Sequence, residues 1–369
     1  MGYSVAIIRS EEYEEKKLEF DIKRVLSYLG SIKKFINKGD KVLIKPNLLS
    51  PKPPESACTT HPVFVKSVIR IIKEAGGIPY LGDSPAFHNL KNVLITSGIQ
   101  KVCDEEGVGV VKFETPIEVK NPQGNIVKSF VIAKEILEFD KIINLPKLKN
   151  HSLTLITVAA KNLFGVIPGV RKGEYHIRFK DAYRFSQMII DLNMLLKPVL
   201  SIVDGIVGME GEGPADGLPK KCNVIIAGND TIAVDYISAL IMNYEPFDIP
   251  LIKAAREANF GGYSSNLIDL KGEPLNSLIV KDFKTLLPKR HSFLIRFGYD
   301  LAQKFIVKRP VIKKKVCIGC GDCANTCPVK TISIINKKAE IDYSKCIRCY
   351  CCFEVCRFSA IKLVRFILK

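Results

Sequence analysis

The sequence lacks the short motifs that would assign a common enzymatic function at once. It contains no GxxxxGK[ST], GxGxxG or GxSxG pattern, so it supports neither a nucleoside triphosphate site, nor a nicotinamide fingerprint, nor a serine-hydrolase elbow. It also lacks any apolar run of roughly 18 to 20 residues, which a membrane-spanning helix needs. The apolar stretch after Met1 ends at Arg9 and is too short for a signal peptide. We therefore expect a cytoplasmic protein.

Disulfide spacing is missing as well, although the chain has 12 cysteines. Four of them show no pairing pattern: Cys58, Cys103, Cys222 and Cys351. The other eight form two copies of a CxxCxxCxxxC run, beginning at Cys317 and at Cys346. This is the ligand spacing of a bacterial-type ferredoxin with two [4Fe-4S] clusters. Paired CxxC elements also make zinc sites, but one zinc ion takes four ligands, so eight thiolates in this order suit zinc poorly.

The interlocked runs also predict which cysteines bind which cluster, because the fourth cysteine of each run ligates the partner cluster. Cluster 1 is predicted to bind Cys317, Cys320, Cys323 and Cys356. Cluster 2 is predicted to bind Cys346, Cys349, Cys352 and Cys327. Cys351 lies outside the pattern and is expected to be a bystander thiol. Arg357 stands where the first run has Pro328, and it is expected to donate to a cluster sulfur or to a docked partner.

The net charge of +17 is unevenly distributed along the chain. Residues 281–315 carry 11 Lys and Arg against 2 Asp and Glu. Apolar residues spaced three or four apart predict an amphipathic helix there, followed by a basic linker: Phe293, Leu294, Phe297, Leu301 and Phe305. Three interpretations stay open, namely packing on the main domain, docking of an acidic redox partner, and contact with an anionic membrane surface. Membrane contact is not favoured, and nucleic acid is favoured still less because no nucleic-acid motif is present.

The first 285 residues alternate between strand and helix patterns. Short β-branched segments predict strands at 4–8, 41–45, 78–81, 108–113, 141–145, 199–203 and 222–227, with a hairpin at 117–120 and 126–132. Helical periods predict helices at 18–36, 62–75, 154–164, 182–196 and 231–242. This order indicates an α/β fold with a mainly parallel mixed sheet and flanking helices. A small α+β ferredoxin-like domain is expected to follow it.

Several segments resemble a known family. They are residues 44–48 (IKPNL), 59–62 (TTHP), 82–85 (GDSP), 144–147 (NLPK), 149–151 (KNH), 160–165 (AKNLFG) and 204–214. In this order they look like the prokaryotic family called domain of unknown function 362, whose members are often fused to a two-cluster ferredoxin. The resemblance implies the α/β fold and the clusters, and it implies no particular reaction. The segments 149–151, 160–165 and 168–169 are also similar, in the order of residue types, to stretches of nickel-pincer lactate racemases, but the nickel cofactor is not carried over.

Polar residues follow the predicted strands, and in parallel sheets ligands bind at the carboxyl ends of strands. We select eight candidates for catalysis or substrate binding: Lys45, Asn47, His61, Asp83, His151, Lys161, Asn162 and Glu212. Each has an alternative interpretation. His151 is a general base, a metal ligand or a helix cap, while Lys161 is a base, a Schiff-base former or an anion clamp unless its ammonium reaches solvent. Gly165 and Gly169 leave room for a ligand.

For the remaining candidates the structural alternatives are more ordinary. His61 precedes a proline at a helix start, and Asp83 suits a turn. The segment with Glu210, Glu212 and Asp216 could bind a divalent cation or form a mobile lid.

Three parts are therefore predicted: an α/β domain at 1–285, a basic amphipathic helix and linker at 286–315, and a two-cluster ferredoxin domain at 316–369. We predict an iron-sulfur oxidoreductase whose ferredoxin domain relays electrons to a small anionic substrate or cofactor in the α/β domain. A redox partner protein or a reduced ferredoxin is the expected electron source. The alternative is a non-catalytic electron-transfer or assembly partner that docks another redox protein.

Overall fold

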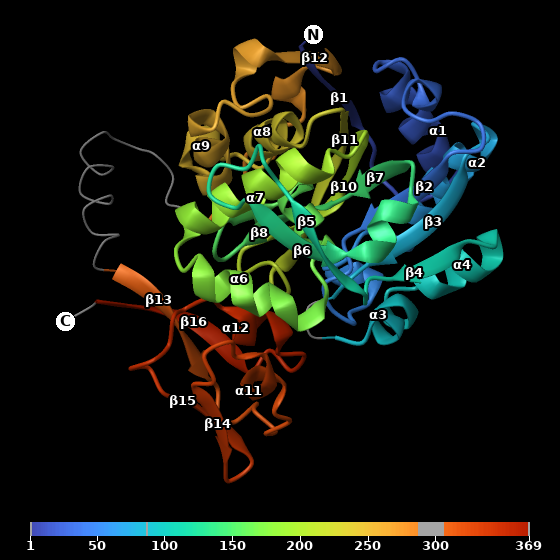
Figure 1. Cartoon of the computed structure of the whole chain (residues 1–369). Helices are drawn as coiled ribbons and strands as arrows, with labels where there is room; N and C mark the ends of the chain where they lie inside the picture. Colours follow the sequence, from blue (N-terminus) through green and yellow to red (C-terminus); the bar gives the residue numbers. More distant parts are fainter. Residues whose placement is uncertain (1, 86–87, 287–305, 368–369) are drawn as a thin grey trace.

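The computed structural model describes residues 2–85, 88–286 and 306–367. An α/β domain with a central sheet fills the first two ranges, and a small domain built from the last range packs against it (Figure 1). The predicted helix at residues 289–305 lies outside the described residues.

The central sheet is mixed and mainly parallel. Its strands are β1 (Tyr3–Arg9), β2 (Lys41–Pro46), β3 (Ile78–Asp83), β4 (Gly109–Lys112), β7 (Lys141–Leu145), β8 (Lys147–His151), β9 (Leu155–Thr157), β10 (Leu200–Glu210), β11 (Leu218–Gly228) and β12 (Ile268–Gly272). The main order is β12-β1-β11-β10-β7-β2-β3-β4. The run from β10 to β4 is parallel, and β11 is antiparallel to both of its neighbours. Because β8 also pairs with β10, it lies beside the carboxyl ends of the parallel strands.

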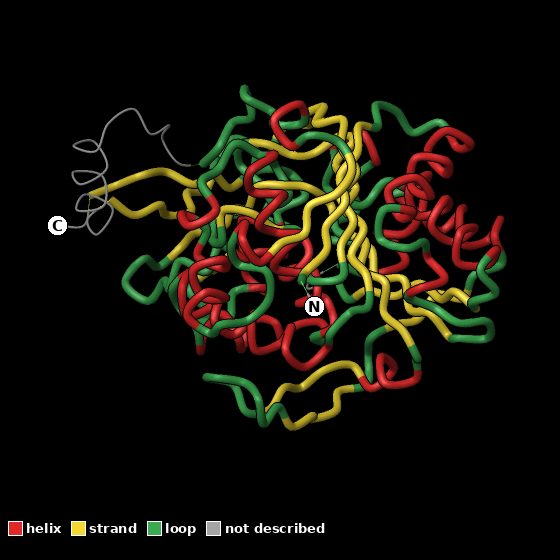
Figure 2. The backbone as a smooth tube through the Cα atoms, turned by 90° about the horizontal axis from the view of Figure 1, so that it is seen from above, coloured by secondary structure: helices red, strands yellow, loops and turns green. Residues whose placement is uncertain are grey.

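Helices cover both faces of this sheet, as Figure 2 shows. They are α1 (Glu15–Ser27), α2 (Pro62–Glu74), α3 (Leu90–Thr96), α4 (Ile99–Glu106), α5 (Ala159–Asn162), α6 (Lys172–Arg178), α7 (Ala182–Leu196), α8 (Thr231–Ile241) and α9 (Pro250–Glu257). Side chains of β1 alternate between the two cores. Ala6 and Ile8 join the core under α1 and α2, while Val5 and Ile7 join the core under α7 and α8. The predicted α/β class with flanking helices is confirmed.

The small domain is built from short elements around the cysteines. They are β13 (Ile306–Ile312), α11 (Asp322–Thr326), β14 (Ile332–Ile335), β15 (Lys338–Ile341), α12 (Cys351–Val355) and β16 (Ile361–Ile367). Strands β13 and β16 pair along their whole length, and β14 pairs with β15. Helix α12 lies next to the α/β domain, α11 packs against α12, and β14 lies toward the far end of the small domain (Figure 1).

Three local expectations differ from the structure. The helix predicted at 154–164 is divided into strand β9, the single turn of α5 and a 3-10 turn, because Leu155 adopts a positive φ of 67° that ends any helix there. The helix predicted at 18–36 ends at Ser27 and is followed by a 3-10 turn. Part of the predicted basic linker is strand β13, since its backbone pairs with the end of the chain.

The predicted hairpin is present, as strands β5 (Pro116–Lys120) and β6 (Ser129–Ala133), but it forms a separate two-stranded sheet. No helix in the described part of the chain combines the length and the apolar character needed to cross a bilayer. The cytoplasmic location and the division at residues 285 and 315 stay predictions.

Candidate functional site

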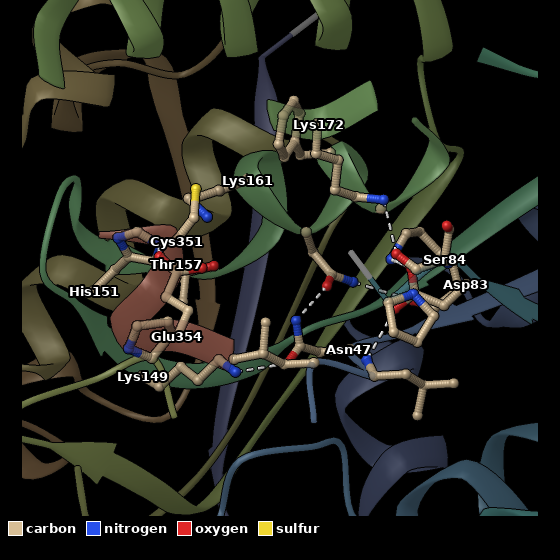
Figure 3. A pocket seen from close by; sticks show the side chains of 18 of the residues that line it. Asn47, Asp83, Ser84, Lys149, His151, Thr157, Lys161, Lys172, Cys351 and Glu354 are labelled. Carbon is tan, nitrogen blue, oxygen red and sulfur yellow. Dashed lines mark hydrogen bonds and ion pairs between the residues drawn. The ribbon is translucent and has the colours of Figure 1, made fainter. Parts of the chain in front are cut away.

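A cavity of about 80 Å3 lies between the carboxyl ends of the sheet strands and helix α12 (Figure 3). A water molecule needs roughly 10 to 15 Å3 by this measure, so the cavity can hold several waters or one small polar molecule. Six of the eight predicted residues line it: Lys45, Asn47, Asp83, His151, Lys161 and Asn162. The structure therefore brings together residues that are up to 117 positions apart in the chain.

The other two predicted residues lie elsewhere. His61 caps helix α2, where its Nδ1 accepts the Val63 N–H at 3.3 Å and its ring stacks on Tyr13 with 3.6 Å between centroids. The carboxylate of Glu212 lies 3.4 Å from the ammonium of Lys308. Neither side chain is part of the cavity wall.

The acidic segment that contains Glu212 does not assemble as a cation site. The carboxylate of Glu210 lies 3.7 Å from the ammonium of Lys284, and that of Asp216 lies 2.5 Å from the ammonium of Lys52. In the ranges that the structure describes, no group of three or more His, Cys, Asp or Glu side chains is placed to hold a single metal ion.

A chain of side-chain hydrogen bonds, which we call the amide chain, runs from the cavity wall into the sheet. The Lys149 ammonium donates to Asn47 at 2.7 Å, and the Asn47 amide donates to Asn162 at 2.9 Å. Asn162 in turn donates to Asn144 at 2.8 Å, and Asn144 donates to Ser201 at 3.2 Å. These residues come from five separate segments, so the chain of hydrogen bonds fixes the wall in one arrangement.

A buried ion pair also lines the cavity. The Lys45 ammonium lies 2.9 Å from the Asp83 carboxylate, which also accepts the backbone N–H groups of Leu48 at 2.9 Å and Ser84 at 2.8 Å. Gly165 faces this pair. A Cβ on Gly165 would lie 2.1 Å from the Asp83 carboxylate and 2.5 Å from the Lys45 ammonium, so only a glycine lets the backbone approach the pair this closely.

The cavity has an excess of cationic side chains. Four lysines and two carboxylates line it: Lys45, Lys149, Lys161, Lys172, Asp83 and Glu354. Burial lowers the pKa of every one of these lysines, to about 8 for Lys149 and about 7 for Lys172. An anion in the cavity would offset this unbalanced charge.

Two of these lysines differ in their partners. Lys172 donates to the backbone carbonyl of Ser84 at 2.8 Å and to that of Ile167. Among the described residues, Lys161 has no hydrogen bond or ion pair, and its ammonium lies 6.0 Å from the centre of the Phe185 ring. Lys161 is therefore the cation that is free to bind a ligand.

His151 contacts the small domain through Glu354. Its Nδ1 accepts the backbone N–H groups of Leu153 at 3.1 Å and Thr154 at 3.3 Å, so Nε2 carries the proton. Nε2 lies 3.3 Å from the Glu354 carboxylate, without hydrogen-bond alignment, and has no other partner among the described residues. Burial lowers the pKa of His151 to about 4, so the ring is neutral at pH 7. Burial alone raises the pKa of Glu354, but His151 and Lys161 lower it to about 2.

The eight cysteines of the two runs lie in two groups of four, each around its own cavity. We call the first group the cluster 1 site: Cys317, Cys320, Cys323 and Cys356. The second group is the cluster 2 site: Cys327, Cys346, Cys349 and Cys352. Four thiols that converge on one cavity fit a cubane cluster, so the residues present fit the implied cofactor.

Two neighbours of these cysteines differ from the sequence-based expectations. Cys351, expected to be a bystander, lines the cavity together with Glu354, because α12 turns both side chains toward the α/β domain (Figure 3). Arg357 donates to the carboxylate of Asp322, at 3.0 Å from Nε and at 2.8 Å from a terminal nitrogen. In the described structure its partner is thus a carboxylate of the small domain.

Comparison with protein families agrees with this architecture. Residues 42–239 match the model of the Domain of unknown function (DUF362). The chain belongs to the DUF362 family. Residues 309–357 match the 4Fe-4S dicluster domain, which confirms iron-sulfur ligation over zinc and makes the C-terminal domain an electron-transfer module.

Curated relatives cover the two domains differently. The thylakoid-associated protein sll1697 of Synechocystis sp. is 34% identical over 285 residues, which are 77% of this chain and 88% of that protein. Pyruvate synthase subunit PorD of Methanothermobacter marburgensis is 40% identical over 57 residues, which are 15% of this chain and 67% of that protein. One subunit of the ion-translocating oxidoreductase complex of Methanosarcina acetivorans is 43% identical over 47 residues, 13% of this chain and 18% of that protein.

Among solved structures, the lactate racemase apoprotein from Thermoanaerobacterium thermosaccharolyticum aligns with 58% of this chain and 54% of its own, at 13% identity and a TM-score of 0.39. A likeness of this extent says nothing about the chemistry of the DUF362 cavity.

Sequence reasoning missed five ionisable residues of the cavity wall. They are Lys149, Lys172, His176, Cys351 and Glu354. Lys149 could have been found, because it lies two positions before His151 on one strand and the two side chains therefore share a face. Nothing in the sequence places the last two in a site of the α/β domain, since they come from the ferredoxin part.

Proposed function

We propose that this protein is an iron-sulfur oxidoreductase whose ferredoxin domain relays single electrons to a small anionic substrate in the cavity. One observation carries the proposal. Helix α12 contributes Cys352 to the cluster 2 site, and the same helix contributes Cys351 and Glu354 to the cavity wall. The cluster 2 site and the cavity are therefore separated by one short helix.

The bound clusters would supply one-electron chemistry, and the other functions fall to side chains of this chain. Lys161 would bind the anionic group of the substrate, since its ammonium has no other partner in the described structure. Neutral His151 would orient the substrate through its Nε2–H. The amide chain and the Lys45–Asp83 pair would hold the remaining walls rigid, so that little reorganisation accompanies binding.

The substrate class follows from charge and size. Four buried lysines face two carboxylates, and the cavity holds about 80 Å3. A small mono- or dianion satisfies both conditions, because it offsets the excess positive charge and leaves no buried cation unpaired. The relatives named as subunits of a pyruvate synthase and of an ion-translocating oxidoreductase support electron transfer by the C-terminal domain, and they do not identify the substrate.

Anaerobic purification tests the proposal. We expect about eight irons per chain and a small anion released on denaturation, which mass spectrometry identifies. The anion should reoxidise dithionite-reduced clusters, and Lys161→Ala should slow this reaction about 10- to 100-fold, the usual cost of a lost hydrogen bond to a charged group. Lys101→Ala is the matched control, since Lys101 is 83% exposed on α4. Unchanged rates in both Lys161→Ala and His151→Ala would refute the proposal.

A further inference from the structure

The two cysteine sites have different surroundings. The cluster 2 site shares α12 with the cavity, and all of its cysteines are buried or half-buried. The cluster 1 site includes residues of α11, which packs against α12, and of β14, which lies toward the far end of the small domain (Figure 1). One of its ligands, Cys320, is exposed. Solvent therefore reaches a ligand of the cluster 1 site, whereas none of the four cluster 2 cysteines is exposed.

Exposed apolar side chains surround that accessible ligand. Ile318 is 57% exposed, Ile334 is 38% exposed and Phe358 is 40% exposed, and all three line the cluster 1 site together with Cys320. We call these four residues the cluster 1 patch. Large apolar side chains that gather around one exposed feature commonly mark an interaction surface.

Basic side chains border the patch. Lys337 belongs to the β14–β15 turn, and its carbonyl oxygen would lie 2.4 Å from a Cβ on Gly319, which places the turn against the loop that carries Ile318. Lys315 lies two residues before Cys317. Both lysines are exposed, and neither has an ion pair among the described residues.

The carboxylates of the same region are already paired. Asp322 accepts from Arg357 at 2.8 Å, and Glu340 accepts from Lys314 at 2.6 Å. The border of the patch therefore offers cations without offering free anions. It is complementary to a surface that carries carboxylates around an apolar centre.

We propose that the cluster 1 patch is the docking site of a small acidic electron-carrier protein, which delivers single electrons to cluster 1. The reduced carrier loses one electron and cluster 1 gains it, with no bond made or broken. This inference rests on the proposed function, because the same electrons would then pass through the cluster 2 site to the cavity. A membrane surface would also accept an apolar patch with a basic border, but an exposed cluster ligand at the centre favours an electron donor.

Reduced flavodoxin serves as the probe, because its flavin absorbance is separable from that of the clusters. Stopped-flow mixing with the oxidised full-length protein, at low salt and without substrate, gives the rate of cluster reduction, and titration calorimetry with oxidised flavodoxin gives the affinity. Ile334→Glu and Lys337→Glu should each lower both quantities about tenfold, since charge reversal at an interface acts on association and on complex lifetime. Raising the salt concentration should have the same effect on the native protein.

Matched controls separate docking from general damage. Leu137→Glu replaces an exposed apolar residue of the α/β domain that is 57% exposed, and Lys101→Glu reverses a distant exposed lysine. Both should leave the rate and affinity unchanged, and dithionite should reduce the clusters of all variants equally. Equal rates for patch and control variants would overturn the proposal, as would failure of flavodoxin to reduce clusters that dithionite reduces.

A membrane role has a different signature. The protein would then sediment with phosphatidylglycerol vesicles, and Ile334→Glu would abolish this binding. If the same substitution leaves the rate of reduction by flavodoxin unchanged, the proposal is also overturned. The measurements need no substrate, so docking can fail while the cavity chemistry stands. The reverse also holds, because loss of the Lys161 effect would refute the cavity chemistry and leave the docking rates untouched.

Discussion

Two buried lysine–aspartate pairs lie on strands of the same sheet, but only one of them lines the cavity described above. Lys147 and Asp204 are 2.7 Å apart, with side chains that are 1% and 0% exposed. Lys45 and Asp83 are 2.9 Å apart, with side chains that are 1% and 5% exposed. Distance and burial therefore do not distinguish the two pairs.

What distinguishes them is the surrounding side chains. Asp204 accepts the hydroxyl of Tyr13 at 2.7 Å and the backbone N–H of His61 at 2.9 Å, and the stacked rings of these two residues cover the pair. Both members of the Lys45–Asp83 pair line the cavity, and Gly165 packs against them without a side chain. The closed pair joins structural elements, whereas the open pair can meet a ligand. A buried ion pair by itself is thus no sign of a functional site.

The largest expected effect is on the closed pair. Asp204→Asn leaves the Lys147 ammonium buried beside a neutral amide, and removing one partner of a buried pair typically costs about 3 to 5 kcal/mol. We expect that loss in the free energy of unfolding of the α/β domain, measured by urea denaturation. Adding Lys147→Met to the same variant should recover much of it, because no unpaired charge then stays buried. A loss below about 1 kcal/mol for Asp204→Asn would show that water reaches the pair.

The open pair should lose less stability than the closed pair, and its loss should weaken ligand binding. In Lys45→Met, the carboxylate of Asp83 keeps its two backbone N–H donors, so we expect a smaller loss of stability, about 1 to 3 kcal/mol. Affinity for the anion that co-purifies with the protein should fall at least about tenfold, measured by titration calorimetry. If Lys45→Met costs as much stability as Asp204→Asn and leaves affinity unchanged, then the open pair is structural as well.

Gly165→Ala probes the opening itself. The added methyl group would lie within 2.5 Å of both Asp83 and Lys45, and such overpacking typically costs about 1 to 3 kcal/mol. We expect about tenfold weaker anion binding. Gly173→Ala is the matched control, since its Cβ would meet Pro328 at an ordinary 3.4 Å. Equal affinities in the two variants would mean that the ligand does not approach the open pair.

The same comparison shows how far sequence reasoning reaches. Strand periodicity and polar strand ends located Lys45, Asp83 and His151, because the carboxyl ends of parallel strands converge on one edge of the sheet. His61 was selected by its place at a helix start before Pro62, and it lies with the closed pair. Sequence position cannot tell which strand-end side chains are covered by aromatic rings and which face a glycine.

Other parts could not be read from the sequence for a different reason. Glu354 and Cys351 follow from how two domains pack together, and no local pattern encodes that contact. The 154–164 segment has a helical pattern, but its backbone pairs with β8 through strand β9, so tertiary pairing overrides the local preference. The cysteine runs, in contrast, could be assigned from the sequence, because their spacing predicts which four cysteines share each site.

The smallest effect should be on the pH dependence of anion binding. Burial lowers the pKa of Lys172 from 10.5 to about 7, so its charge is present below that pH and lost above it. Affinity for the anion should therefore decrease by several-fold as the pH rises from about 6 to about 8, by the loss of one nearby charge. Lys172→Met should bind more weakly at low pH and should lose this dependence near pH 7, whereas the part due to Lys149, with a pKa of about 8, should persist, as calorimetric titrations at each pH would show.

Protein stability should change in the opposite direction over a higher range. Because the folded-state pKa of Lys172 lies below the ordinary value of 10.5, the unfolded state binds more protons between about pH 7 and 10.5. The contribution of this lysine to the free energy of unfolding therefore rises with pH in that window, while anion affinity falls. Urea denaturation of the native protein and of Lys172→Met at several pH values separates the two effects. If stability rises with pH while anion affinity falls, and Lys172→Met reduces both changes, then Lys172 is the titrating group. The bound anion must then lie within reach of its charge.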